Sequence, residues 1–149
     1  MPRFPVLNES DPPTNVADVF ADFRTRMGFP KAPNFILTQG VSPTVVRGTW
    51  GAVRHVLVEG ELPRTLKEMM FVAISIDRNC KYCEAAHIAC CRMLGVDEET
   101  IATLVKSINK MMPEKSRDII QFGVKCARSP QDLGDDDFQQ LRSHGLADY

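Results

Sequence analysis

The sequence lacks any long apolar run, and this absence excludes a helix that crosses a membrane. Its longest apolar segment, Met69 to Ile76, is interrupted by Ser75 and is much shorter than the roughly 20 residues that a bilayer requires. A basic excess is also missing: 18 Lys and Arg against 19 Asp and Glu leave a net charge of −1, and only 7% of residues are aromatic. Surfaces that follow phosphates or stack bases depend on these features. We therefore expect no membrane and no nucleic acid among the partners.

A secretion signal is also absent from the first residues. The segment Met1 to Val6 contains two prolines and an arginine instead of the apolar core of a signal peptide. The five cysteines are an odd number, which does not suggest a disulfide framework in a chain without such a signal. We therefore expect a cytoplasmic protein.

The composition that remains is that of one ordinary globular domain. The 149 residues are 44% hydrophobic and 25% charged, close to typical values. A proline-rich start predicts an extended arm over residues 1–14, followed by one domain over residues 15–149. Apolar residues recur there at helical spacing between Pro, Ser, Asp and Gly boundary residues, so the predicted fold class is all-α, a single-domain helical bundle. The pattern predicts helices over residues 16–27, 43–58, 63–76, 79–94, 97–108, 113–124 and 135–144, and a short turn over 33–37.

One segment fits two secondary structures. The apolar run over residues 69–76 is compatible with a buried strand or a buried helix, and the flanking helical patterns favour a helix. A strand would instead lead into the cysteine-containing helix that follows, as in thioredoxin. That arrangement would indicate a thioredoxin-like protein disulfide reductase.

Four of the five cysteines fall between positions 80 and 91, and the first two form a Cys80-x-x-Cys83 pair with His87 one turn further on. On a helix these three residues share one face. A helix start favours the thiolate form of cysteine, and a neighbouring imidazole can accept the thiol proton. Two thiols at this spacing can also close into a disulfide, with one sulfur attacking and the other resolving. The pattern indicates a redox-active dithiol.

Metal binding is the main chemical alternative for this cluster. The ligands Cys80, Cys83, His87 and Cys90 would all come from one helix. Cys80 and Cys90 would then lie about 15 Å apart along it, whereas zinc–sulfur bonds measure about 2.3 Å. We therefore expect no metal site here. The remaining cysteines are interpreted as small core residues: Cys90, Cys91 and Cys126.

Glu68 lies on the preceding predicted helix and has two interpretations. If the two helices are antiparallel, its carboxylate returns beside the cysteine pair, where a buried glutamate can relay a proton. However, Thr65 and Glu68 also fit the spacing of a capping box, which would make Glu68 a purely structural residue.

The order of Glu68, the Cys80-x-x-Cys83 pair and His87 resembles the alkylhydroperoxidase D-like family of the carboxymuconolactone decarboxylase superfamily. The similarity extends from Leu62 to Gly95 and, more weakly, over the helical chain around it. The resemblance implies an all-helical protein that assembles as a homotrimer or homohexamer. It also implies a thiol-dependent hydroperoxide reductase, an antioxidant peroxidase.

The resemblance further implies a role for each site residue. Cys83 would be the attacking thiolate, Cys80 would resolve it, and Glu68 and His87, with a water molecule, would form the proton relay. The reaction would consume a small-molecule hydroperoxide and an external dithiol electron donor, for which a lipoyl-type dithiol is one candidate. No cofactor and no metal ion are implied.

Two features depart from the family pattern. The characterised pattern has a second histidine directly before the second cysteine, where this chain has Tyr82. A phenol with a pKa of about 10 is a poor proton acceptor at neutral pH, although it can donate a hydrogen bond, so Tyr82 is at most a supporting residue. Relatives in the peroxidase-related branch also commonly carry further helices beyond a segment like Ser143 to Leu146. We expect either a shorter variant or missing C-terminal helices.

A non-enzymatic redox-sensing or binding module on the same scaffold is a further alternative. Such a protein would undergo one stoichiometric oxidation and would not turn over. Outside the cluster, Trp50 is interpreted as a core or interface residue and His55 as a surface residue. His144 is expected to interact with the carbonyl end of its own helix.

Overall fold

A computed structural model describes residues 3–146 of the chain. The first two residues of the expected N-terminal arm and the last three residues of the chain lie outside this range. Within it the structure is helical and contains no strand, which confirms the predicted all-α class. No helix among these residues is both long and apolar enough to span a membrane. The chain divides into two compact units, Met1–Glu61 and Leu62–Tyr149, which are described separately below.

The first unit is built from three α-helices and a π-helix around an aromatic core. Its elements are α1 (Ala17–Met27), α2 (Asn34–Gln39), α3 (Pro43–Val53) and the π-helix η1 (Arg54–Glu59). Phe23 packs against Trp50, with ring centroids 4.9 Å apart, and both rings are buried. The indole Nε1–H of Trp50 donates a 2.8 Å hydrogen bond to Asp22. Trp50 is thus a core residue of this unit, as expected, while His55 is exposed and pairs with Glu59.

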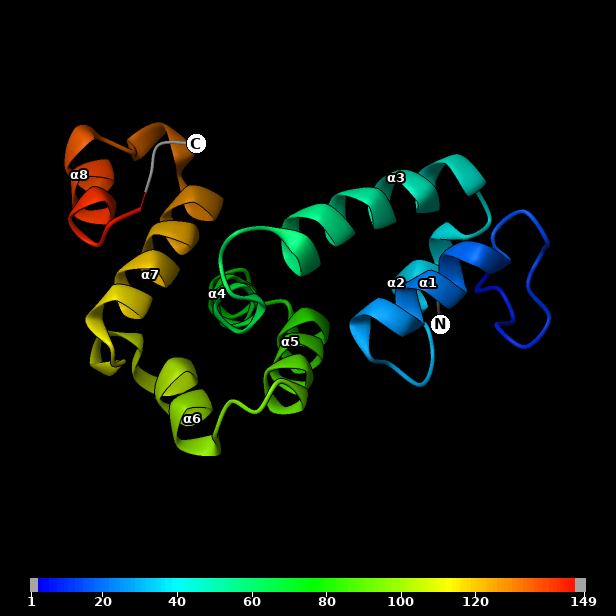
Figure 1. The fold of residues 1–149 in the computed structure, drawn as a ribbon, viewed down its shortest axis with the longest axis horizontal. Helices are drawn as coiled ribbons and strands as arrows, with labels where there is room; N and C mark the ends of the chain where they lie inside the picture. Colours follow the sequence, from blue (N-terminus) through cyan, green and yellow to red (C-terminus); the bar gives the residue numbers. More distant parts are fainter. Residues whose placement is uncertain (1–2, 147–149) are drawn as a thin grey trace. The chain divides into compact units, whose positions relative to one another are not determined.

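The second unit places α4 at its centre. Its elements are α4 (Arg64–Asp77), α5 (Lys81–Met93), α6 (Glu98–Ser107), the 3-10 turn η2 (Ile108–Lys110), α7 (Glu114–Arg128), the 3-10 turn η3 (Pro130–Asp132) and α8 (Asp135–Ser143). Figure 1 shows α4 nearly end-on, with α5, α6 and α7 arranged around it, and α4 makes most of its contacts with α5 and α7. The apolar face of α4 supplies Leu66, Val72 and Ala73 to the core of this unit.

The helix boundaries of this unit follow from local chemistry. Asp97 begins α6 by accepting the N–H of Thr100 at 2.7 Å, as an N-cap aspartate does. Pro113 directly precedes α7, where its fixed φ fits a helix start. The segment over residues 69–76 is helical, so the strand required by the thioredoxin-like alternative is absent from it.

The end of α8 is attached to α7 by a histidine–aspartate pair. The Nε2 atom of His144 lies 2.8 Å from Oδ2 of Asp118, and the Asp118 side chain is buried. From its position in the sequence, His144 is expected to act on its own helix end. Its partner is instead a carboxylate from another helix, which joins α8 to the rest of the unit.

Candidate active site

The two cysteines of the Cys-x-x-Cys pair meet at the start of α5. Cys80 is the N-cap residue, and its sulfur accepts the backbone N–H of Cys83 at 3.4 Å. Asn79, with a φ of 53°, provides the left-handed turn between α4 and α5, a conformation that asparagine tolerates better than most residues. The two sulfur atoms lie 2.7 Å apart and both cysteines are free. A disulfide bond of about 2.05 Å can therefore form with little further approach.

The pair is electrostatically asymmetric. A hydrogen bond from the Cys83 thiol, together with the Cys83 backbone N–H, lowers the pKa of Cys80. The same hydrogen bond to Cys80, together with burial, raises the pKa of Cys83. The thiolate form is therefore favoured more at Cys80 than at Cys83, and the N-terminus of α5 also favours an anion at Cys80.

A buried carboxylate–imidazole pair connects α4 with α5 in the same unit. Oε2 of Glu68 lies 2.7 Å from Nδ1 of His87, and Glu68 is completely buried. Because an ionised carboxylate only accepts hydrogen bonds, we assign the shared proton to Nδ1, which leaves Nε2 as the other nitrogen available for proton transfer. Pro63 precedes α4 and no side chain caps this helix, so the capping-box interpretation of Glu68 is wrong.

Two residues beside this pair were not singled out from the sequence. The Nε–H of Arg64 donates to Oε1 of Glu68 at 3.4 Å, which adds a positive charge next to the buried carboxylate. The ring of Phe71 stacks on the ring of His87, with centroids 4.8 Å apart and an interplanar angle of 13°. Arg64 and Phe71 lie one turn before and one turn after Glu68 on α4. Helical spacing from Glu68 is the one signal that could have pointed to them.

The structure brings the four predicted site residues into two pairs. Cys83 and His87 are one turn apart on α5, a spacing that places them on one face. Within residues 3–146 no direct hydrogen bond joins Cys83 to His87, so a proton passing between the two pairs needs a bridging group such as water. Tyr82 is 54% exposed, and its backbone N–H contributes to the lowered pKa of Cys80.

Cys90 places a sulfur beside the Glu68 carboxylate. Donor atoms of Glu68, His87 and Cys90 lie within 4.8 Å of one another, and burial, followed by the charge of Glu68, raises the pKa of Cys90 to about 12. This donor set suits zinc chemically. However, the guanidinium group of Arg64 occupies the other carboxylate oxygen and opposes a divalent cation there. The cluster also excludes Cys80 and Cys83, unlike the set weighed from the sequence.

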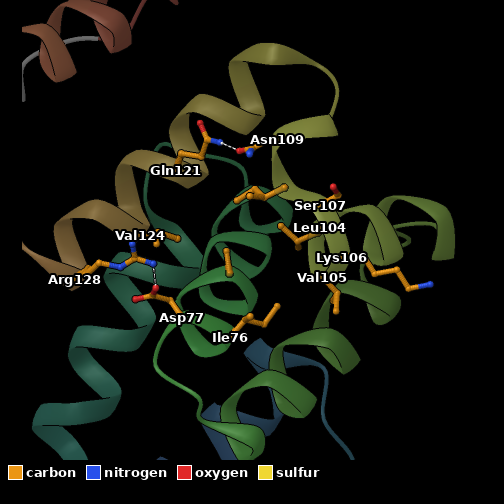
Figure 2. A pocket seen from close by; sticks show the side chains of 12 residues that line it. Ile76, Asp77, Leu104, Val105, Lys106, Ser107, Asn109, Gln121, Val124 and Arg128 are labelled. Atoms are coloured by element: carbon orange, nitrogen blue, oxygen red, sulfur yellow. Dashed lines mark hydrogen bonds and ion pairs between the residues drawn. The ribbon is translucent and has the colours of Figure 1, made fainter.

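A hollow with a volume of about 390 Å³ lies elsewhere in the second unit, between α4, α6, η2 and α7. Figure 2 shows two polar pairs among its lining side chains: Asp77 with Arg128, and Asn109 with Gln121 at 2.7 Å. Apolar side chains such as Val124 complete the lining. None of the predicted site residues lines this hollow, so it is separate from the cysteine pair.

Comparisons with known proteins identify relatives that share the helical fold. A model of the carboxymuconolactone decarboxylase family matches residues 43–108. An alkylhydroperoxidase AhpD core, an uncharacterized peroxidase-related protein from Ralstonia eutropha JMP134, is 26% identical, with 98% of this chain and 77% of that chain covered and a TM-score of 0.83. A peroxidase-related protein from Silicibacter sp. TM1040 is also 26% identical, with coverages of 99% and 79% and a TM-score of 0.79.

A third structure extends the range of chemistry found on this fold. The debrominase Bmp8, solved in complex with 2,3,4-tribromopyrrole, is 21% identical, with 97% of this chain and 76% of that chain covered and a TM-score of 0.80. No curated protein matches the chain. The fold is that of an alkylhydroperoxidase D-like helical protein. Over residues 43–108 the chain is similar to the carboxymuconolactone decarboxylase family, and its structural relatives include peroxidase-related proteins.

Proposed function

We propose that the protein is a thiol-dependent hydroperoxide reductase. The observation that carries this proposal is the presence, on the adjoining helices α4 and α5, of both a dithiol with sulfurs 2.7 Å apart and a buried Glu68–His87 pair. The dithiol supplies two electrons and the pair supplies a proton route. The peroxidase-related names of two structures at 26% identity support the same reaction class.

In the proposed reaction Cys83 attacks and Cys80 resolves. The thiol proton of Cys83 passes through a bridging group such as water to Nε2 of His87, which leaves the Cys83 thiolate. The thiolate attacks one peroxide oxygen, the O–O bond breaks, and Cys83 becomes a sulfenic acid. The departing alkoxide takes this proton from Nε2 of His87 and leaves as an alcohol.

The second step closes the disulfide. The sulfur of Cys80 attacks the sulfenic sulfur of Cys83, and the hydroxyl leaves as water with the proton of Cys80. An external dithiol then reduces the disulfide and is itself oxidised. The net reaction converts one hydroperoxide and one dithiol into an alcohol, water and one disulfide. We propose a lipoyl-type dithiol as the donor, and a homotrimer or homohexamer as the assembly, to be checked by light scattering.

The proposal is tested with three cysteine variants. Reduced protein is mixed with cumene hydroperoxide and dihydrolipoamide, peroxide loss is followed, and sulfenic acid is trapped with dimedone and located by mass spectrometry. Cys83→Ser should lose both turnover and trapping. Cys80→Ser should lose turnover but accumulate the trapped adduct on Cys83. Cys126→Ser, which alters a cysteine on α7 outside the site, should behave as the wild type.

Two results would contradict the proposal. Trapping on Cys80 in the Cys83→Ser variant would reverse the roles of the two sulfurs, in line with the lowered pKa of Cys80. A wild-type protein that consumes a single equivalent of peroxide and then stops, with the donor still in excess, would be a redox sensor instead of an enzyme.

A further inference from the structure

We propose that Phe71 is a positioning residue for His87, holding the imidazole plane in the orientation that proton transfer requires. This inference rests on the proposed function, because it concerns the same Glu68–His87 pair. It adds a residue that carries no titratable group and that the sequence pattern did not single out.

The first part of the argument is the number of restraints that an imidazole ring needs. The hydrogen bond between Nδ1 of His87 and Oε2 of Glu68 fixes one nitrogen but still allows the ring to tilt about that bond. Tilting moves Nε2, on the opposite edge, away from its line of transfer. Proton transfer is sensitive to such displacements because the donor and acceptor must lie within about 2.6 to 3.2 Å of each other.

The ring of Phe71 supplies the missing restraint. The two rings are nearly parallel, at 13°, with centroids 4.8 Å apart. This separation lies within the range of favourable aromatic pairs. The stack opposes tilting of the imidazole, while the carboxylate opposes rotation within its plane. The two interactions together define both the position and the plane of the His87 ring.

Both restraints come from α4. Phe71 follows Glu68 by one turn, so the two side chains share a helix face and approach His87 on α5 together. Phe71 is 37% exposed, a low degree of burial for a phenylalanine whose only task is to fill the core. Its ring therefore covers one face of the imidazole at the surface of the unit and leaves Nε2, in the ring plane, for proton exchange.

The test compares variants at position 71 that keep or remove the stack. Phe71→Tyr keeps an aromatic ring, Phe71→Leu keeps apolar volume without one, and Phe71→Ala removes both. We expect kcat for cumene hydroperoxide to fall about threefold to tenfold in the leucine and alanine variants, the range that an aromatic pair commonly supports. KM should change less than kcat, and Phe71→Tyr should restore kcat to near the wild-type value.

A spectroscopic readout makes the test independent of turnover. In ¹H–¹⁵N spectra, the ring protons of His87 should be shifted upfield by the Phe71 ring current, and the Nδ1–H signal should be protected from solvent exchange. Phe71→Leu and Phe71→Ala should remove the shift and broaden the Nδ1–H signal, whereas Phe71→Tyr should preserve both. Phe138→Ala is the matched control, because Phe138 is 40% exposed and packs edge to face against Phe122 in a different part of the unit.

The outcomes separate this inference from the proposed function. Full activity and an intact Nδ1–H signal in Phe71→Leu would overturn the inference, because apolar volume alone would then suffice. If the wild type does not turn over peroxide, the proposed function fails. The spectra still decide the inference in that case: loss of the protected Nδ1–H signal in the leucine variant supports it, and retention of that signal refutes it.

Discussion

Replacing Glu68 by glutamine removes one charge from a completely buried site while keeping the shape of the side chain. Glu68 lies 2.7 Å from His87 and 3.4 Å from Arg64, so the change removes the negative charge from both contacts. A hydrogen bond to a charged group contributes about 1.5 to 3 kcal/mol. Removing a general acid or base lowers rates by about 10² to 10⁴.

We therefore expect the second-order rate constant for oxidation of Cys83 by cumene hydroperoxide to fall at least about a hundredfold in Glu68→Gln. Stability should fall by only about 1 to 3 kcal/mol, because the amide can still hydrogen-bond to His87. For a chain of this size that loss corresponds to a decrease in Tm of a few degrees, roughly 2 to 4 °C per kcal/mol. Stopped-flow thiol oxidation measures the rate, and circular dichroism measures the melting.

The matched control is Glu98→Gln. Glu98 pairs with Arg92, but its side chain is 68% exposed, and exposed pairs contribute about 0 to 1 kcal/mol. Both rate and Tm should stay near the wild-type values. If Glu68→Gln folds and still oxidises within about threefold of the wild-type rate, then Glu68 is not part of a proton relay.

Three further predictions concern the thiol pair, the α7–α8 connection and the core. Since a hydrogen bond from Cys83 lowers the pKa of Cys80, iodoacetamide should modify Cys80 at a pH below the value of about 8.5 typical of free thiols, and Cys83→Ala should raise that pH; an unchanged alkylation profile would contradict this. Burial raises the pKa of Asp118, but its hydrogen bonds, with His144 first, outweigh burial and the net pKa is lowered. Asp118 thus stabilises the fold above its unfolded pKa of about 3.9, and this contribution is lost as pH falls through the folded value. In urea titrations Asp118→Asn should therefore cost about 1 to 3 kcal/mol at pH 7 and less in acid, and an equal cost at both pH values would refute the assignment. Ile120→Ala, at a completely buried core position, should lower the free energy of unfolding by about 2 to 5 kcal/mol, and a loss below 1 kcal/mol would show that the site collapses around the smaller residue.

The fold was largely predictable because many boundary residues act on their own backbone. Asp97 begins α6 through a hydrogen bond within one turn, and Pro113 precedes α7 because its ring fixes φ. The π-helix over Arg54–Glu59 carried no such signal, since its apolar residues also fit an α-helix. Cys80 was expected inside the first turn of its helix, and it is the N-cap instead.

The site was predictable in its residue types but not in its contacts. The sequence order placed Glu68, Cys80, Cys83 and His87 on two successive helices. Which side chains touch depends on rotamers and on how α4 crosses α5, which no local pattern encodes. For the same reason the stack of Phe71 on His87 and the bond from Arg64 to Glu68 became visible only in three dimensions.

The position of Cys80 as the N-cap of α5 affects how readily a Cys80–Cys83 disulfide is reduced. The backbone N–H of Cys83 and the helix start stabilise the anionic sulfur, and this stabilisation exists only while the sulfur is reduced. A dithiol whose reduced form is favoured gives a disulfide that is a stronger oxidant. The N-cap position of Cys80 therefore makes the Cys80–Cys83 disulfide easier to reduce. This favours the last step of the proposed cycle, in which an external dithiol reduces the disulfide.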